Sequence, residues 1–177
     1  MTQPGMRVQM QTLSQPQQKP AQPQQKPVPD KRILRAFVAR RYIGGSGIEI
    51  GALGTPLDLP PGAQVKYVDR MSKADLYNEY KEMANRKLVE TDIIDDGEKL
   101  KTIPDDSLDF IVANHFLEHC ENLLGTLQTH AGKLRKGGRL FYAVPNRDFT
   151  FDRNRPVTPF SHIVKDYEEG PEQARAA

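Results

Sequence analysis

The sequence predicts an α/β fold in which a mainly parallel, doubly wound sheet of about five strands has helices on both faces. Short apolar segments typical of buried strands alternate with segments of helical periodicity, and this alternation requires crossover connections between parallel strands. Polar residues and glycines follow several of these strands. In such sheets, ligands bind at the carboxyl ends of the strands, so these residues are the candidates for a site.

The 177-residue chain divides into a leader, one domain and a tail. Residues 1–29 form a Pro- and Gln-rich leader, which we expect to be disordered because it has no apolar surface to offset the entropy of ordering. Residues 30–170 are predicted to form the domain, and residues 171–177 a flexible tail. Since the chain has no apolar run that could span a membrane and no secretory signal, we expect a cytoplasmic protein.

The net charge of +2 is unevenly distributed. Residues 1–45 carry eight Lys or Arg residues and one acid, a charge of +7, which leaves −5 for the remainder. This mildly acidic domain argues against a nucleic-acid partner. The single cysteine, Cys120, excludes an internal disulfide, and we expect it to be a packed thiol.

The expected strands differ in how clearly the sequence marks them. They are Gly47–Ile50, Gln64–Val68, Leu88–Ile94, Leu108–Ala113 and Arg139–Val144. The fourth is almost wholly apolar, whereas Glu90 and Asp92 interrupt the third. Pro145 ends the fifth strand.

Three expected helices cover approximately residues 31–42, 73–86 and 117–134. Asp30 caps the first, and Ser72 with Asp75 forms a capping box for the second. Four apolar residues lie on one face of the first helix: Ile33, Leu34, Phe37 and Val38. The third is expected to end at Lys136-Gly137-Gly138, whose glycines suit a left-handed cap.

A glycine turn follows the first strand. Gly51 and Gly54 allow a tight turn and let a ligand approach the backbone. The segment Gly51-Ala52-Leu53-Gly54 lacks the middle glycine of the dinucleotide fingerprint G-x-G-x-x-G. An NAD(P)-binding domain is therefore the weaker alternative, and an ordinary strand-to-helix turn is the alternative without a ligand.

Acidic residues end the next two strands. Asp69 lies 18 residues after Gly51, a spacing at which an acid accepts hydrogen bonds from ribose hydroxyls. A carboxylate of Asp95 or Asp96 can accept the amino group of an adenine, and Gly97 can offer its backbone N–H. The alternatives are surface acids without a ligand.

The fourth strand is followed by Asn114-His115-Phe116-Leu117-Glu118-His119. Polar residues at this position are expected to face the ligand cleft, although Glu118 also suits the start of a helix. His115 and His119 do not form the metal motif H-E-x-x-H, so we predict no metal. No Ser-His-Asp or Cys-His set stands out.

With these residues in place, the chain resembles a class I S-adenosylmethionine-dependent methyltransferase with a Rossmann-like domain, of the small bacterial type often associated with glycans. Five segments carry the resemblance: residues 47–61, 67–70, 94–98, 103–119 and 134–140. The segment 150–158 and the later His162 and Asp166 also resemble that group. The family would supply S-adenosylmethionine as cofactor and a small-molecule or glycan as methyl acceptor.

The resemblance implies a role for each residue of the glycine turn. Glu49, Gly51 and Gly54 would shape the cofactor turn, and Ala52 and Leu53 would line the methionine moiety. The commoner family pattern has glycines at positions 53 and 55 instead, so the shape of this turn is expected to differ.

For the nucleoside, the resemblance implies that Asp69 holds the ribose and that Arg70 or Met71 packs near the adenine. Asp96 and Gly97, next to Asp95, would meet the adenine edge.

Asn114 and His115 would close over the sulfonium. A hydroxyl acceptor needs a base, for which His119 and His162 are the candidates. Three residues are expected to shape the acceptor site: Asp152, Arg153 and Arg155.

The strands that normally complete the sheet of this family after the fifth strand are not visible in the sequence. An open sheet edge can associate with a second copy. The alternative function is therefore a shortened, non-catalytic methyltransferase-like domain that acts through partner contacts.

Overall fold

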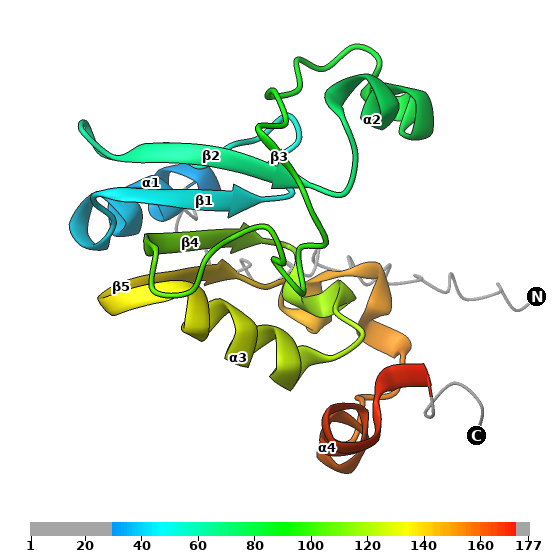
Figure 1. Cartoon of the computed structure of the whole chain (residues 1–177). Coiled ribbons are helices and arrows are strands. Elements are labelled where there is room, and N and C mark those ends of the chain that lie inside the picture. The colour runs from blue at the N-terminus through cyan, green and yellow to red at the C-terminus, as the bar shows by residue number, and fades with distance from the viewer. Residues whose placement is uncertain (1–29, 173–177) are drawn as a thin grey trace, which may run out of the picture.

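The computed structural model describes residues 30–172. The predicted leader, residues 1–29, and residues 173–177 of the predicted tail lie outside the described residues. The described part contains one five-stranded sheet with helices on both faces (Figure 1).

All the strand pairings are parallel, so the arrowheads in Figure 1 point the same way. The strands are β1 (Ser46–Ile50), β2 (Gln64–Asp69), β3 (Ile93–Ile94), β4 (Leu108–Asn114) and β5 (Leu134–Ala143). Their order in the sheet is β3-β2-β1-β4-β5, so the direction of winding reverses at β1. This Rossmann-like arrangement confirms the predicted fold class.

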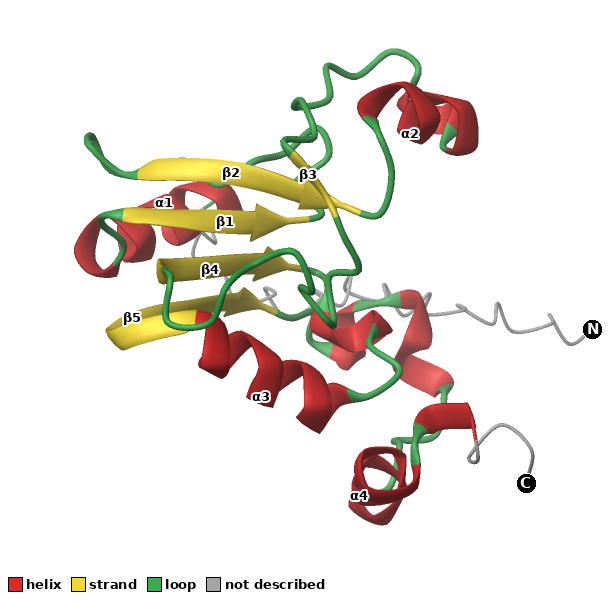
Figure 2. Cartoon of the chain, in the orientation of Figure 1, coloured by secondary structure: helices red, strands yellow, loops and turns green. Residues whose placement is uncertain are grey.

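One helix precedes the first strand, two lie between strands along the chain, and one follows the last strand (Figure 2). They are α1 (Lys31–Tyr42), α2 (Lys73–Glu79), α3 (Leu123–Lys133) and α4 (Phe160–Glu169), with 3₁₀ turns η1 (Lys81–Met83), η2 (Leu117–His119), η3 (Arg147–Phe149) and η4 (Phe151–Asn154). Asp30 and Ser72 cap α1 and α2 as predicted, each accepting a backbone N–H with its side chain.

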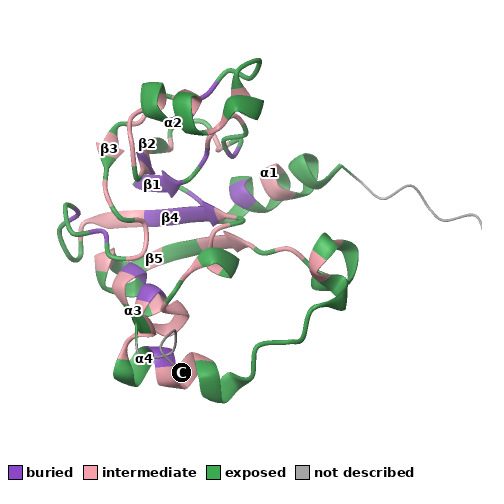
Figure 3. Cartoon of the chain, turned by 90° about the vertical axis from the view of Figure 1, so that its right-hand side faces the viewer, coloured by how far each residue is buried: buried purple, intermediate pink, exposed green. Residues whose placement is uncertain are grey.

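The side chains of β4 divide the core into two layers, because successive residues of a strand point to opposite faces. Phe110 and Val112 are fully buried on the face where they pack with Ala39 of α1. Ile111 and Ala113 are fully buried on the other face, in the layer that Tyr142 of β5 also contacts. Figure 3 shows α1 and α3 on opposite sides of the sheet.

The apolar face predicted for α1 does not enter the core. Ala39 is the buried residue of this helix. The four apolar residues are 41% to 72% exposed: Ile33, Leu34, Phe37 and Val38. The helix contacts the sheet through its C-terminal part, whereas Arg35 in its N-terminal part reaches the residue that follows β4.

The second helix is shorter in the structure than the sequence predicted. α2 ends at Glu79 rather than near Arg86. The hydroxyl of Tyr77 donates to the carbonyl of Arg86 at 2.8 Å and accepts from the N–H of Leu88 at 3.1 Å. These bonds fold the segment back against α2 instead of continuing the helix.

The third predicted strand, Leu88–Ile94, is also too long, because β3 contains only Ile93 and Ile94. The N–H of Val89 donates to the carbonyl of Leu53 at 2.9 Å. The first part of the predicted strand therefore pairs with the turn after β1 rather than with β2.

The predicted helix 117–134 is divided in two. η2 ends at His119, and Asn122 caps α3 by accepting from the N–H of Gly125 at 2.8 Å. The predicted stop at Lys136-Gly137-Gly138 lies inside β5. There, Leu134 pairs with Leu108 and Arg139 with Phe110, so residues 135–138 bulge outward from the ladder.

Within the described residues, β5 pairs only with β4, and its second edge has no neighbouring strand. No helix in residues 30–172 is long and apolar enough to cross a bilayer.

We expect Phe110→Ala to lower the free energy of unfolding by about 3–5 kcal/mol, because it leaves a cavity between α1 and the sheet. Phe149→Ala is the matched control, since Phe149 is 88% exposed; it should change stability by less than about 0.5 kcal/mol. Denaturant unfolding measures both variants. Equal losses would contradict the assignment of the core.

Candidate functional site

A cleft of about 920 Å³ lies at the carboxyl ends of the strands. Its walls come from the turns that follow β1, β2, β3 and β4 and from the segment after α2. They are formed by Ile50, Gly51, Leu53, Asp69, Arg70, Tyr80, Glu82, Met83, Ile94, Asp95, Asp96, Gly97, Glu98, His115, Phe116 and His119. The structure thus brings residues from four separate turns into one cavity.

The turn after β1 has left-handed backbone geometry at two positions, with φ of 64° at Gly51 and 48° at Leu53. A Cβ atom added at Gly51 would have no other atom within 4 Å. The backbone of Gly51 therefore borders open space, which a ligand needs if it is to approach the backbone closely. The conformation of Leu53 is unfavourable for a residue with a side chain, and the N–H of Val89 helps to hold it by bonding to its carbonyl.

Glu49 lies beneath this turn rather than in the cleft. It is 1% exposed, and its two carboxylate oxygens lie 3.1 and 3.0 Å from the N–H of Leu57. Asn114 donates to it from Nδ2 at 3.4 Å. Burial raises the pKa of Glu49 to about 7. The carboxyl group joins the segment after the turn to the end of β4.

Asp69 is the last residue of β2 and lines the cleft. Its carboxylate accepts from the N–H of Arg70 at 2.8 Å, and partial burial raises its pKa. The side chain of Arg70 forms an ion pair with Glu79 and lies 5.9 Å from the centre of the Tyr80 ring. Asp69, Arg70 and Tyr80 all line the cleft.

The carboxylate of Asp95 is fully engaged within the protein. It accepts from the N–H of Asp96 at 2.7 Å, and from the N–H and hydroxyl of Thr102 at 2.7 and 2.6 Å. Although partial burial raises the pKa of Asp95, the hydrogen bonds from Thr102 bring it below its ordinary value. Asp95 therefore builds the turn. Asp96 is exposed, accepts from the N–H of Glu98 at 2.9 Å and forms an ion pair with Lys99 at 3.0 Å.

Gly97 has no room for a side chain. A Cβ atom would lie 2.8 Å from both Ile50 Cγ2 and Phe116 Cζ. Its carbonyl accepts from Nε2 of the buried His130 at 2.8 Å, and Nδ1 of His130 lies 2.7 Å from the hydroxyl of Tyr142. Burial lowers the pKa of His130, so the imidazole is neutral and the Tyr142 hydroxyl donates to Nδ1.

Glu98 fastens the same turn to α3. Its carboxylate accepts from the N–H groups of Glu121 and Asn122 at 3.0 and 3.2 Å and from the hydroxyl of Thr126 at 3.1 Å. Sequence patterns did not reveal this contact or the role of His130, because both depend on how α3 packs on the sheet.

His115 follows β4 and has a left-handed φ of 53°. Its Nε2 accepts from Arg35 at 2.8 Å, and its Nδ1 lies 3.4 Å from Oε1 of Glu118. His115 lines both the cleft and a second cavity of about 630 Å³, whereas Asn114 lines only the second cavity. Asn114 Oδ1 is buried and has no hydrogen-bond partner among the described residues.

The other expected site residues are distributed around the cleft. Ala52 is buried, Gly54 lines the second cavity, and Met71 lies outside both. His119 lines the cleft. The expected acceptor residues Asp152, Arg153 and Arg155 belong to η4 or follow it and line neither cavity; Arg155 forms an ion pair with Asp152 at 2.9 Å.

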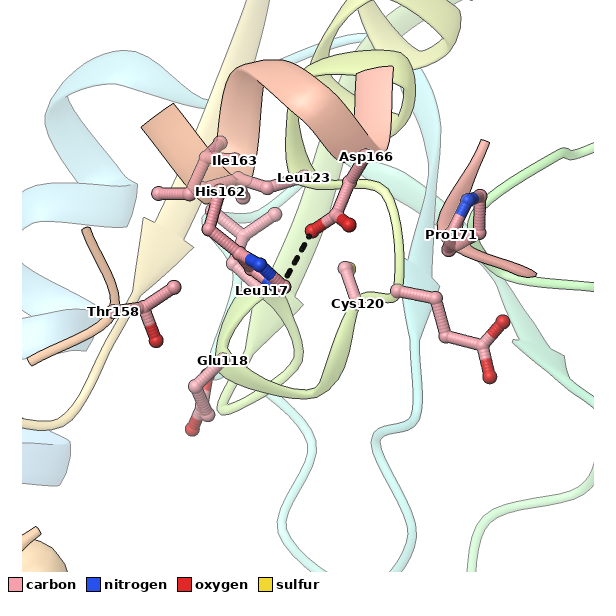
Figure 4. Close-up of a pocket in the computed structure, with 10 residues that line it drawn as sticks. Leu117, Glu118, Cys120, Leu123, Thr158, His162, Ile163, Asp166 and Pro171 are labelled. Atoms are coloured by element: carbon pink, nitrogen blue, oxygen red, sulfur yellow. Dashed lines mark ion pairs between the residues drawn. The ribbon is translucent and has the colours of Figure 1, made fainter. Parts of the chain in front are cut away.

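His162 lies in a third cavity of about 400 Å³, between η2 and α4 (Figure 4). Its Nε2 is 3.4 Å from Oδ2 of Asp166, a residue that is 9% exposed. Cys120 lines the same cavity, and burial raises the pKa of its thiol to about 11. This thiol is protonated at neutral pH, so it is a packed group and a poor nucleophile.

No group of side chains suited to hold a metal ion occurs within residues 30–172.

The sequence profile of the methyltransferase domain family matches residues 24–171. The match covers most of the chain, and the chain belongs to this family. The resemblance to class I methyltransferases is thus confirmed at the level of the family. No curated protein matches the chain.

Several solved structures are similar to this one. A putative S-adenosylmethionine-dependent methyltransferase from Methanococcus maripaludis is 20% identical, with a TM-score of 0.47 over 63% of this chain and 53% of the other. The YcgJ protein from Bacillus subtilis is 22% identical, with a TM-score of 0.46 over 63% and 48%. A methyltransferase from Aquifex aeolicus is 14% identical, with a TM-score of 0.49 over 77% of each chain. The chain spans about half the length of the first two proteins.

The raised pKa of Glu49 predicts a specific dependence of stability on pH. Because the carboxyl group ionises near pH 4.5 when unfolded and near pH 7 when folded, it stabilises the folded state fully below pH 4.5, and this contribution is lost as pH rises through 7. The difference between these two pKa values corresponds to a change of about 3 kcal/mol in the free energy of unfolding. Glu49→Gln should therefore become more stable relative to the wild type as pH increases from 5 to 8.

Urea unfolding across this pH range measures the effect, with Glu168→Gln at an exposed position as control. The control should follow the wild-type profile. A Glu49→Gln profile parallel to the wild type would show that Glu49 is ionised throughout.

Proposed function

We propose that this protein is an S-adenosylmethionine-dependent methyltransferase that acts on a small-molecule or glycan acceptor. The observation that carries the proposal is the convergence of Gly51, Asp69, Asp96 and Gly97 on one cleft at the strand ends, in a chain of the methyltransferase domain family. S-adenosylmethionine presents three parts to such a cleft: an adenine, a ribose and a methionine moiety.

The described residues fit these parts. The N–H of Gly97 has no acceptor within residues 30–172, so it can donate to an adenine ring nitrogen, and Asp96 next to it can accept the amino group. Asp69 can accept from the ribose hydroxyls. Open space at Gly51 leaves room for the methionine moiety against the backbone.

The bound sulfonium would supply the methyl group, and the protein would mainly align the acceptor with it and exclude water. An acceptor hydroxyl also has to lose its proton to a base. His119 and His162 are candidates for this role. His119 lines the cleft itself, whereas His162 faces the adjacent cavity between η2 and α4.

Isothermal titration with S-adenosylhomocysteine tests the proposal. We expect Asp69→Asn and Asp96→Asn each to weaken binding by about tenfold to a hundredfold, because each loses a hydrogen bond to a charged acceptor. Asp148→Asn is the matched control, since Asp148 is exposed and does not line the cleft.

Titration with NAD separates the alternatives. Binding of NAD in place of S-adenosylhomocysteine would favour a dinucleotide-binding domain. No binding of S-adenosylmethionine, S-adenosylhomocysteine or NAD would favour a non-catalytic domain that acts through partner contacts.

We also propose that this is a cytoplasmic protein with residues 30–170 as its domain.

We further propose that the chain self-associates through the open edge of β5. The edge is a strand of ten residues that carries the partly exposed Leu140 and pairs on one side only among the described residues. Such an edge presents unpaired N–H and C=O groups to a second copy.

Sedimentation velocity measures this association. Leu140→Lys should shift the wild-type dimer toward the monomer, because an edge lysine opposes strand pairing. Val157→Lys, at a position 69% exposed outside the sheet, should leave the dimer intact. A wild type that stays monomeric at submillimolar concentration would exclude self-association.

A further inference from the structure

The second cavity, of about 630 Å³, adjoins the cleft and is strongly basic. It lies on the other side of the turn after β1, and five of its lining side chains are cationic: Lys31, Arg32, Arg35, Arg86 and Lys87. His115 lines both the cavity and the cleft, so the two spaces meet at this residue.

The positive charge of this cavity is only partly offset within the described residues, where the carboxyl group of Glu49 attracts Arg35. None of the five cationic side chains forms an ion pair with another residue of the segment 30–172, although many other surface cations do. The one acid that lines the cavity, Asp58, is paired with Arg40 at 2.8 Å. Cations gathered in a concave space repel one another and raise the local concentration of anions.

One of these cations is bonded to the residue at the junction. Arg35 Nη2 lies 2.8 Å from Nε2 of His115. Because a guanidinium only donates hydrogen bonds, Nε2 of His115 must be the acceptor, and the ring proton is then on Nδ1. That nitrogen lies 3.4 Å from the carboxylate of Glu118.

This arrangement has the form of an oriented base. A carboxylate beside Nδ1 fixes the ring and its tautomer and stabilises the positive charge that appears when Nε2 takes up a proton. His119, which also lines the cleft, has no such carboxylate partner among the described residues. The left-handed φ of 53° at His115 is the kind of backbone strain that clusters at functional sites.

We propose that the basic cavity binds an anionic group, a phosphate or a carboxylate, of the methyl acceptor, and that this binding draws Arg35 away from His115 and frees Nε2 as the base. This inference rests on the proposed methyltransferase function. It assigns an anionic acceptor class to the site and gives His115 a catalytic role.

In the resulting step, a hydroxyl oxygen or amine nitrogen of the acceptor forms a bond to the methyl carbon. The bond between that carbon and sulfur breaks, and its electron pair stays on sulfur, which becomes a neutral thioether. The proton of the acceptor passes to His115 Nε2, and the resulting imidazolium faces the carboxylate of Glu118.

Nitrogen-15 NMR of the full chain tests the inference with inorganic phosphate and acetate as probes, titrated against chloride at constant ionic strength. We expect one or both anions to shift the amide signals of Gly54 and Thr55, which line the cavity, and to move the His115 Nε2 signal toward that of a nitrogen without a donor. A response to phosphate alone or to acetate alone assigns the acceptor anion to that class.

Arg35→Gln should weaken the binding of the responding anion by about tenfold, because a charge-assisted hydrogen bond is lost. Arg41→Gln removes the same charge from an exposed position of α1 that does not line the cavity, and should leave anion binding unchanged. Equal effects of the two variants would overturn the assigned site.

Two further outcomes would overturn parts of the inference. No response to either anion excludes an anion subsite, and amide shifts without a change at His115 Nε2 exclude the release of the base. Titration of the wild type with S-adenosylhomocysteine keeps the two proposals apart. If this ligand binds and the anions do not, only the inference fails, whereas no binding of this ligand contradicts the proposed function itself.

Discussion

The parallel pairing of β1 with β2 on one side and with β4 on the other is the constraint on which the cleft depends. Ile50 pairs with Val68 and Ala113, so the turns after these three strands begin at nearly the same level. Because the winding direction reverses at β1, the connections leave its carboxyl end in opposite directions, and a crevice opens there. The glycine turn, Asp69 and His115 face each other for this reason.

Two buried polar groups keep the turns in their places. Glu49 joins the segment after the first turn to Asn114, and His130 joins the turn at Gly97 to Tyr142. A buried polar group destabilises the fold unless it is hydrogen-bonded, so each group strongly favours the one loop arrangement that satisfies it. The shape of the cleft therefore depends on buried side chains that do not line it.

The sequence predicted the strand ends well, because an apolar segment followed by glycine or acid is a local signal. It placed Gly51, Asp69, Asp96 and His115 after successive strands, and these residues line one cleft. It did not predict the contact between Arg35 and His115, which are 80 residues apart, or that Tyr80 enters the cleft after α2 ends early. The glycines of β5 misled the prediction, since a bulge within a strand and a helix cap both favour a left-handed residue.

The cleft is assembled from turns distributed between Ile50 and His119, so no single segment contains a usable part of it. A chain in which only one strand pair or one helix has formed has nothing with which to hold a ligand. Any molecule that occupies the cleft must therefore bind the folded state in preference to the unfolded one, and by mass action it raises the stability of the whole sheet. Occupancy of the cleft and completion of folding are in this sense two aspects of the same equilibrium.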